Sequence, residues 1–142
     1  MRDVLANLPG YALRRAANAM MSELANRLAV VDMRVSDASV MMMLGATPGI
    51  TASEVGRALD IERANMVPLL NRIEEAGLIE RQPLDRKSLG ILLTREGEER
   101  LARIREIVER FEQDLIDRIP KEHRDHFLPA LNALWHHRAV KS

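Results

Sequence analysis

The sequence has 142 residues, of which 46% are apolar and 30% are charged, with 21 basic and 21 acidic side chains and no cysteine. This composition is typical of a folded domain, and the 3% share of aromatic residues favours packed helices over a β-sandwich. The lack of cysteine excludes disulfides, thiolate catalysis and cysteine-based zinc sites. Residues 1–10 lack the shape of a signal peptide, and no stretch reaches the roughly 18 apolar residues of a membrane span. We therefore expect a cytoplasmic protein.

Apolar residues at helical spacing predict a first helix from Pro9 to about Val31. Ser36 is a candidate N-cap for a second helix over 37–46. The centre of that segment is apolar on all sides, which is typical of a buried helix. A Thr-Pro-Gly sequence at 47–49 ends it.

The sequence at 51–54, Thr-Ala-Ser-Glu, is a capping box and predicts a short helix that ends near Leu59. Asp60 or Glu62 begins the next helix, which we expect to end at Ala76. Two short helices joined by a tight turn are the arrangement of a helix–turn–helix, whose second helix lies in the DNA major groove.

Gly77 occupies the position at which a glycine commonly ends a helix. Extended segments at 78–81 and 88–93, with a polar turn at 82–87 between them, predict a β-hairpin. Thr94 is a candidate cap for a long helix that Pro120 ends.

A last helix is expected over 121–139, with a kink or a restart at Pro129. It contains all the histidines of the chain, which are His123, His126, His136 and His137. His123 and His126 could provide half of a metal site, but surface or interface histidines are the more common case. We predict no metal site and no cofactor.

The second short helix has one apolar face and one polar face. Arg63 suits guanine and Asn65 suits adenine, because each can form two hydrogen bonds to the base edge in the major groove. The alternative is a solvated helix with ordinary charges. Basic side chains in the hairpin, at Arg81, Arg86 and Lys87, could enter the minor groove or bind phosphate, or they could simply keep the turn soluble.

Together these segments resemble the MarR family of bacterial transcriptional regulators. The resemblance covers 35–101. It is carried by Val35–Val40 at a helix start, Thr51–Leu59 in the supporting helix, Ile61–Arg72 in the recognition helix, Ile73–Arg81 at its exit, Asp85–Lys87 in the wing and Leu93–Gly97 at the strand end.

The resemblance implies a mainly α fold with a small β-hairpin wing, in a single domain spanning 1–142. A winged helix–turn–helix over 35–101 would be flanked by dimerisation helices over 8–31 and 102–139. The apolar stripes of the terminal helices agree with burial in a homodimer. The resemblance further implies binding to a palindromic double-stranded operator, and repression relieved by a small aromatic or phenolic ligand.

The predicted DNA contacts combine the outward face of the recognition helix with the wing and the start of the supporting helix. They are Thr51, Arg63, Ala64, Asn65, Val67, Pro68, Asn71, Arg72, Arg86 and Lys87. Arg86 is the candidate for the minor groove, with a phosphate contact from Lys87.

Pro68 departs from the family pattern, because it lies inside the recognition helix. Proline removes a helical hydrogen bond and pushes Val67 away from helical angles. The functional hypothesis is that a bend re-aims Arg63 and Asn65 while Val67 and Pro68 contact thymine methyl groups. A harmless kink at a solvated site is the alternative.

The family's ligand pocket would lie between the dimer helices and the DNA-binding region. Candidate lining residues are Tyr11, Arg14, Arg15, Asn18, Met41 and Met42. An arginine facing an apolar cleft suits a carboxylate or phenolate, although Arg14 and Arg15 are more commonly ordinary surface residues. Oxidation of the methionines at 41–43 is a further possibility, but buried core methionines are the commoner case.

An enzyme and a protein-interaction module are the two other function classes open to a chain of this kind. The sequence has no nucleotide-binding glycine motif and no nucleophile elbow, and its acidic residues are scattered among helical charge pairs, so we do not expect an enzyme. A winged helix used only for protein–protein contact stays open. In that case Arg63, Asn65, Arg72 and Arg86 would be charged or polar residues at an interface rim.

Overall fold

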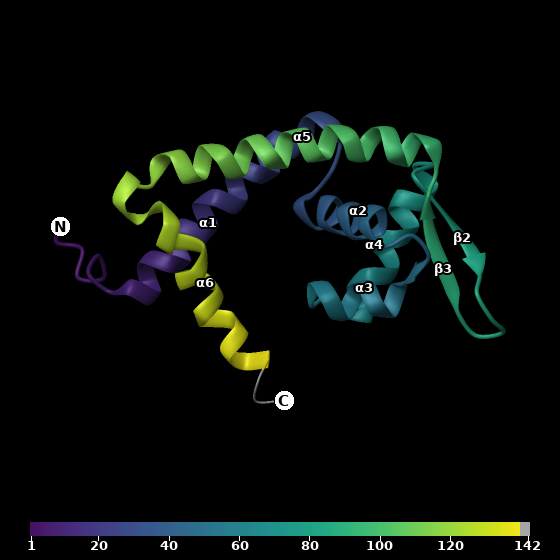
Figure 1. Cartoon of the computed structure of the whole chain (residues 1–142), viewed down its shortest axis with the longest axis horizontal. Helices are drawn as coiled ribbons and strands as arrows, with labels where there is room; N and C mark the ends of the chain where they lie inside the picture. The colour runs from purple at the N-terminus through teal and green to yellow at the C-terminus, as the bar shows by residue number, and fades with distance from the viewer. Residues whose placement is uncertain (140–142) are drawn as a thin grey trace. The chain divides into compact units, whose positions relative to one another are not determined.

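The computed structural model describes residues 1–139, with side chains as far as His136. It contains helices joined by a small antiparallel sheet (Figure 1). The chain divides into two compact units, Met1–Val108 and a second one that begins at Glu109. The helices and strands of the first unit are α1 (Pro9–Leu28), α2 (Val35–Ala46), β1 (Ile50–Thr51), α3 (Ala52–Leu59), α4 (Arg63–Glu75), β2 (Ile79–Pro83), β3 (Leu89–Leu93) and the first part of α5 (Arg95–Arg118).

The start of α1 at Pro9 is as predicted, and a 3-10 turn over Ala29–Val31 follows it. The prediction for the second helix is wrong by two residues, because α2 begins at Val35 and its N-cap is Arg34. The physical reason is Asp37, whose carboxylate accepts a hydrogen bond from the Arg34 backbone N–H at 3.0 Å. That bond satisfies a backbone donor at the helix start, as a capping box does.

The predicted capping box of α3 is confirmed. The Thr51 hydroxyl accepts from the Glu54 N–H at 3.2 Å, and the Glu54 carboxylate accepts from the Thr51 N–H at 3.0 Å. Asp60 ends α3 in a left-handed conformation with φ 56°, so Glu62 and not Asp60 is the N-cap of α4. The turn between the two helices is therefore tight, as a helix–turn–helix requires.

Gly77 ends α4 with φ 79°, a conformation that favours glycine. The Gly77 N–H donates to the Glu74 carbonyl and the Leu78 N–H donates to the Ile73 carbonyl. This pair of hydrogen bonds is a Schellman motif, which satisfies helix-end carbonyls. The chain leaves α4 directly into β2.

The predicted hairpin is present, but its strands differ from the expectation. Gln82 and Pro83 were expected in the turn and instead belong to β2, where they pair with Gly90 and Leu89. A third strand, β1, was not predicted and pairs with β3, so the order is β1-β3-β2. A two-residue strand is too short to show the alternation from which strands are predicted.

Thr94 caps α5 as predicted, because its hydroxyl accepts from the Gly97 N–H at 3.0 Å. The same hydroxyl donates to the Gly77 carbonyl at 2.6 Å and so joins the end of α4 to the start of α5. The core of this first unit is aliphatic. Its most deeply buried side chains are Leu28, Val40, Met41, Leu44, Val55, Leu70, Ile73, Leu78, Ile91, Leu101 and Ile104.

The second unit holds the end of α5, a 3-10 turn over Lys121–His123 and α6 (Arg124–Ala139). Of the kink or restart expected at Pro129, the restart is wrong, because α6 continues through this residue, and the kink stays a prediction. Its apolar side chains are largely exposed, with Leu128, Leu134 and Trp135 each more than half accessible. In the described part of the chain, no helix has the length and apolar character needed to cross a membrane.

Candidate nucleic-acid interface

Helix α4 presents two clearly different faces, as predicted. Met66, Leu69, Leu70 and Ile73 are buried against the core of the first unit. The opposite face is exposed and carries Arg63, Ala64, Asn65, Val67, Pro68 and Asn71. Ile61, which was expected in the core, lies before the helix and is only half-buried. The exposed face therefore offers donors, acceptors and apolar groups to a ligand.

Pro68 does not interrupt α4, which is a single helix from Arg63 to Glu75. The prediction that Val67 leaves the helical conformation is therefore wrong. Met66 and Leu69 on either side are buried, and this packing holds the backbone helical despite the hydrogen bond that proline removes. Val67 and Pro68 consequently stay on the exposed face, where Val67 is 49% accessible.

Arg72 is not a free cation on that face, because it forms an ion pair with Asp37 of α2 at 2.5 Å. Asp37 is 3% exposed, and its other oxygen accepts from the Arg34 N–H. A buried carboxylate needs partners of this kind. Sequence reasoning missed Asp37, although an acid within an otherwise apolar helix was the available signal.

Asn71 and Arg81 connect the recognition helix to the wing. The Asn71 side-chain oxygen accepts a hydrogen bond from the Arg81 guanidinium at 3.1 Å. Arg81 Nε also lies 3.2 Å from Glu74 Oε2, an ion pair that is not aligned for a hydrogen bond. Arg81 therefore belongs to the junction between α4 and β2, and not to the free basic tip in which the sequence placed it.

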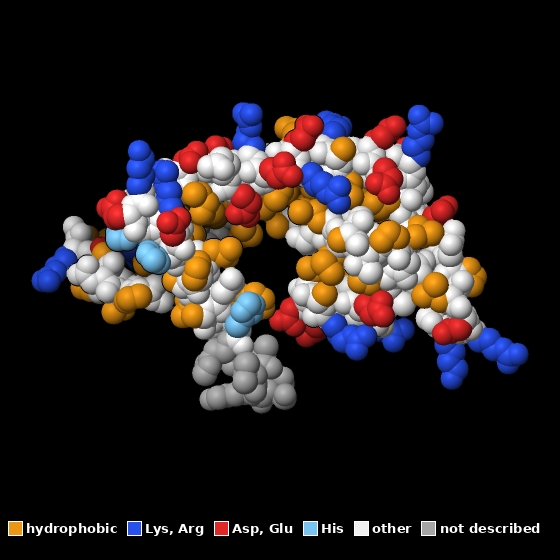
Figure 2. Space-filling model, in the orientation of Figure 1, with side chains coloured by type: hydrophobic (Ala, Val, Ile, Leu, Met, Phe, Trp, Pro, Cys, Tyr) orange, Lys and Arg blue, Asp and Glu red, His pale blue; other side chains and the backbone are white. Residues whose placement is uncertain are grey.

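The tip of the wing is organised by Asp85. Its Oδ1 accepts hydrogen bonds from the Lys87 N–H at 2.8 Å, the Ser88 N–H at 2.9 Å and the Ser88 hydroxyl at 2.8 Å. These donors, the Lys87 N–H foremost, lower the pKa of the Asp85 carboxyl below its ordinary 3.8. The backbone is thereby shaped locally, and the side chains of Arg86 and Lys87 are left exposed. Figure 2 shows basic side chains at this tip.

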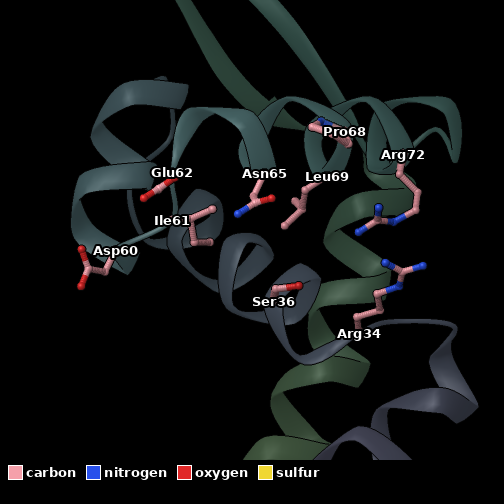
Figure 3. Close-up of a pocket in the computed structure, with 9 residues that line it drawn as sticks. All are labelled: Arg34, Ser36, Asp60, Ile61, Glu62, Asn65, Pro68, Leu69 and Arg72. Atoms are coloured by element: carbon pink, nitrogen blue, oxygen red, sulfur yellow. The ribbon is translucent and has the colours of Figure 1, made fainter.

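A groove of about 580 Å³ lies between the start of α2 and the side of α4. Figure 3 shows Arg34 and Arg72 turned toward each other at one end, and Asp60 and Glu62 at the other. Its complete lining is Arg34, Ser36, Asp60, Ile61, Glu62, Asn65, Pro68, Leu69 and Arg72. Asn65, Pro68 and Arg72 are predicted DNA contacts, so the groove adjoins the candidate interface.

The predicted effector residues differ in burial. Met41 is fully buried and Met42 is half-buried in α2, whereas Arg14 and Asn18 are exposed on α1. The Arg15 guanidinium lies 5.4 Å from the Tyr11 ring centroid and forms an ion pair with Asp3 at 2.6 Å. This ion pair lowers the pKa of the Asp3 carboxyl. The ligand pocket thus stays a prediction.

The histidines contribute no recognisable metal site within the described residues. His123 is in the 3-10 turn that precedes α6, and His126 and His136 are in α6. The side chain of His137 lies outside the described residues. No three or more histidine, aspartate or glutamate side chains come together there in a way that could hold a metal ion.

Comparison with known proteins agrees with this geometry. Residues 31–88 match the model of the MarR family. The solved structure of the transcriptional repressor CouR bound to a 23-mer DNA duplex is 31% identical, with a TM-score of 0.85, and the match covers 94% of this chain and 99% of that one. The chain belongs to the MarR family.

Two further relatives extend the comparison. The structure of CouR bound to p-coumaroyl-CoA is 30% identical, with a TM-score of 0.79, and the match covers 94% of this chain and 96% of that one. A protein of Thauera aromatica that is assigned to regulation of the hcr operon is 29% identical over 129 residues, which cover 89% of this chain and 78% of that protein. The predicted fold class is confirmed: the chain is a winged helix–turn–helix with additional helices at both ends.

Proposed function

We propose that this MarR-family protein is a homodimeric repressor that binds palindromic operator DNA through α4 and the wing. The observation that carries the proposal is the exposed side of α4. Arg63, Asn65 and Val67 are exposed there, while the opposite side of the helix is apolar and buried. Arginine and asparagine recognise guanine and adenine edges, and apolar groups contact the thymine methyl. The structural likeness to CouR bound to a DNA duplex supports this assignment.

The wing would add affinity without base recognition. Arg86 and Lys87 are exposed on a loop whose backbone Asp85 holds in place, so they can reach phosphates or the minor groove. Thr51 is at the start of α3 and can approach the DNA backbone, although its hydroxyl is occupied as the N-cap. A dimer would double each of these contacts.

The exposed apolar side chains of α6 support the homodimer. Leu128, Leu134 and Trp135 form part of the surface of the second unit, and monomeric proteins rarely leave several large apolar groups exposed on one helix. A twofold dimer would also match the symmetry of a palindromic operator. Sedimentation at low micromolar concentration tests this, and a monomer would contradict it.

The effector we propose is an aromatic acid or its coenzyme A thioester. The support comes from the likeness to CouR bound to p-coumaroyl-CoA. Tyr11, Arg14, Arg15 and Asn18 remain the proposed contacts on α1, with Met42 of α2 accessible beside the buried Met41. Titration calorimetry with aromatic acids and their coenzyme A thioesters tests this. A compound that binds should also release the protein from DNA.

The DNA-binding proposal is tested by fluorescence anisotropy with the duplex upstream of the protein's own gene, over a range of salt concentrations. We expect binding that weakens steeply as salt increases, since phosphate contacts release counterions. Absence of binding at low salt would favour the protein-interaction alternative.

Selection from a randomised duplex library tests base recognition by α4. Pro68→Arg should change the selected sequence, because it places a guanidinium among Asn65, Val67 and Asn71 on the exposed face. Arg95→Gln, at an exposed position of α5, is the control and should leave the selected sequence unchanged. Identical selection by Pro68→Arg and the wild type would contradict base contact at this position.

A further inference from the structure

We infer that Arg34 and Arg72 form a phosphate clamp, a paired-arginine site beside α4 that binds one phosphate of the DNA backbone. This inference rests on the proposed DNA-binding function and adds Arg34, which the sequence analysis did not select. Arg34 is the N-cap residue of α2 and Arg72 is in α4, and the two side chains line the same end of the groove (Figure 3).

The net charge at this end of the groove favours binding of an anion. Arg34 and Arg72 each carry a positive charge, and their guanidinium groups turn toward each other (Figure 3). Asp37 neutralises one of them through its ion pair with Arg72. Among the described residues, no carboxylate forms an ion pair with the Arg34 side chain. Two guanidinium groups and one carboxylate therefore leave a net positive charge, which a phosphate diester would balance.

The guanidinium group is chemically suited to bind a phosphate. Its planar array of N–H donors can make two parallel hydrogen bonds to phosphate oxygens, and two such groups can bind one phosphate from different sides. Arg72 is held in place by Asp37, so one half of the clamp is ordered before the ligand arrives. Asp60 and Glu62 line the far end and repel phosphate, which confines the site to the arginine end.

The position of the groove favours the DNA backbone as the source of this phosphate. Asn65 and Pro68 line the groove and also belong to the exposed face of α4. A helix in a major groove about 12 Å wide has phosphates along both of its sides. Arg34 lies beside α4. Its side chain is therefore placed to contact the DNA backbone while the exposed face of α4 contacts the bases.

The clamp is tested with Arg34→Ala and a duplex that the wild type binds. Arg34 is exposed, so the variant should fold with an unchanged thermal transition. We expect roughly tenfold weaker binding to specific and non-specific duplexes alike. The slope of log K against log salt should become flatter by about two, one phosphate for each protomer of the dimer.

Arg95→Ala is the matched control, because it removes the same charge from a side chain that is 94% exposed on α5, away from the groove. Its affinity and salt slope should equal those of the wild type. Arg34→Ala with the affinity and slope of the wild type would overturn the clamp and leave DNA binding intact. A wild type that binds no duplex at low salt would overturn the proposed function itself, and the clamp with it.

A second measurement locates the phosphate. Duplexes with a single neutral methylphosphonate at each flanking position should weaken wild-type binding at one position in each half-site, and Arg34→Ala should be insensitive at that position. If both proteins lose the same affinity there, the clamp is wrong. Calorimetry with coenzyme A tests whether the phosphate comes from a small ligand and not from DNA. If coenzyme A binds the wild type but not Arg34→Ala, and the two proteins have the same salt slope on DNA, the assignment to the DNA backbone is wrong.

Discussion

The junction between the C-terminal half of α4 and β2 carries basic residues, and so does the tip of the wing, but the two regions use them differently. In the first region, Arg72 is paired with buried Asp37 and Arg81 is bonded to Asn71. In the second region, Asp85 binds the backbone of its own loop, and the side chains of Arg86 and Lys87 remain exposed. An arginine near the proposed DNA-binding face can thus link two elements, remain available to DNA, or, as proposed for Arg72, do both.

This difference determines what each substitution should change. Removing a link leaves a partly buried partner without its bond, so the free energy of unfolding should fall. Removing an exposed cation should leave the fold intact and weaken DNA binding at all sequences. The segment from Thr51 to Thr94 carries slightly more acidic than basic residues, so DNA affinity would depend on a few placed cations.

Asp37→Ala is expected to have the largest effect. It removes the ion pair with Arg72, which is 40% exposed, and the hydrogen bond to the Arg34 N–H at the start of α2. We expect a loss of roughly 2–3 kcal/mol in the free energy of unfolding, measured by urea denaturation. Asp37→Asn should recover part of it, since an amide oxygen can still accept the N–H. An unchanged urea midpoint for Asp37→Ala would show that the pair does not stabilise the fold.

Arg81→Ala should have the next largest effect. The side chain is 28% exposed and lies against both Asn71 and Glu74 of α4. We expect a loss of about 1–2 kcal/mol in the free energy of unfolding. Gln82→Ala, at the neighbouring exposed position of β2, is the control and should change little. Equal unfolding curves for the two variants would show that Arg81 does not stabilise the fold and in this respect resembles Arg86 and Lys87 at the wing tip.

Arg86→Ala should leave the unfolding curve unchanged and weaken DNA binding by roughly fivefold, or about 1 kcal/mol. The residue is exposed at the wing tip, so its charge is available to the DNA and not needed by the fold. Anisotropy on several duplex sequences measures this. A loss confined to one base position would identify direct base recognition by Arg86 in place of backbone contact.

The smallest expected effect is the pH dependence of the wing tip. Hydrogen bonds from the Lys87 N–H and from Ser88 lower the folded-state pKa of Asp85 below its ordinary 3.8. The order that this carboxylate imposes is therefore complete above the ordinary value and is lost as the pH falls through the lowered folded pKa. The protection of the Lys87 and Ser88 amides, measured as hydrogen exchange relative to the intrinsic rate at each pH, should fall in that acidic range, whereas that of the helix amides of α4 should not. Protection that persists through the acidic range would show that Asp85 does not order the tip.

Much of the fold could be predicted because its signals are local. The capping box at Thr51, the C-terminal glycine at Gly77 and the cap at Thr94 each depend on residues within three positions, and all three are confirmed. The exposed and buried faces of α4 followed from helical periodicity. Failures occurred where a short element lacked such a signal, as in β1, or where packing overrode a local rule, as at Pro68.

The candidate site could be predicted as a surface but not in its connections. The sequence by itself determined that Arg63, Asn65 and Pro68 lie outside the buried stripe of α4, since the helical repeat assigns that stripe to Met66, Leu69, Leu70 and Ile73. Only the tertiary structure decided that Arg72 is held by an acid 35 residues earlier in the chain, and that Arg34 lies across a groove from it. The physical reason is range: backbone hydrogen bonds and helical periodicity act over three or four residues, whereas an ion pair between helices depends on how their cores pack.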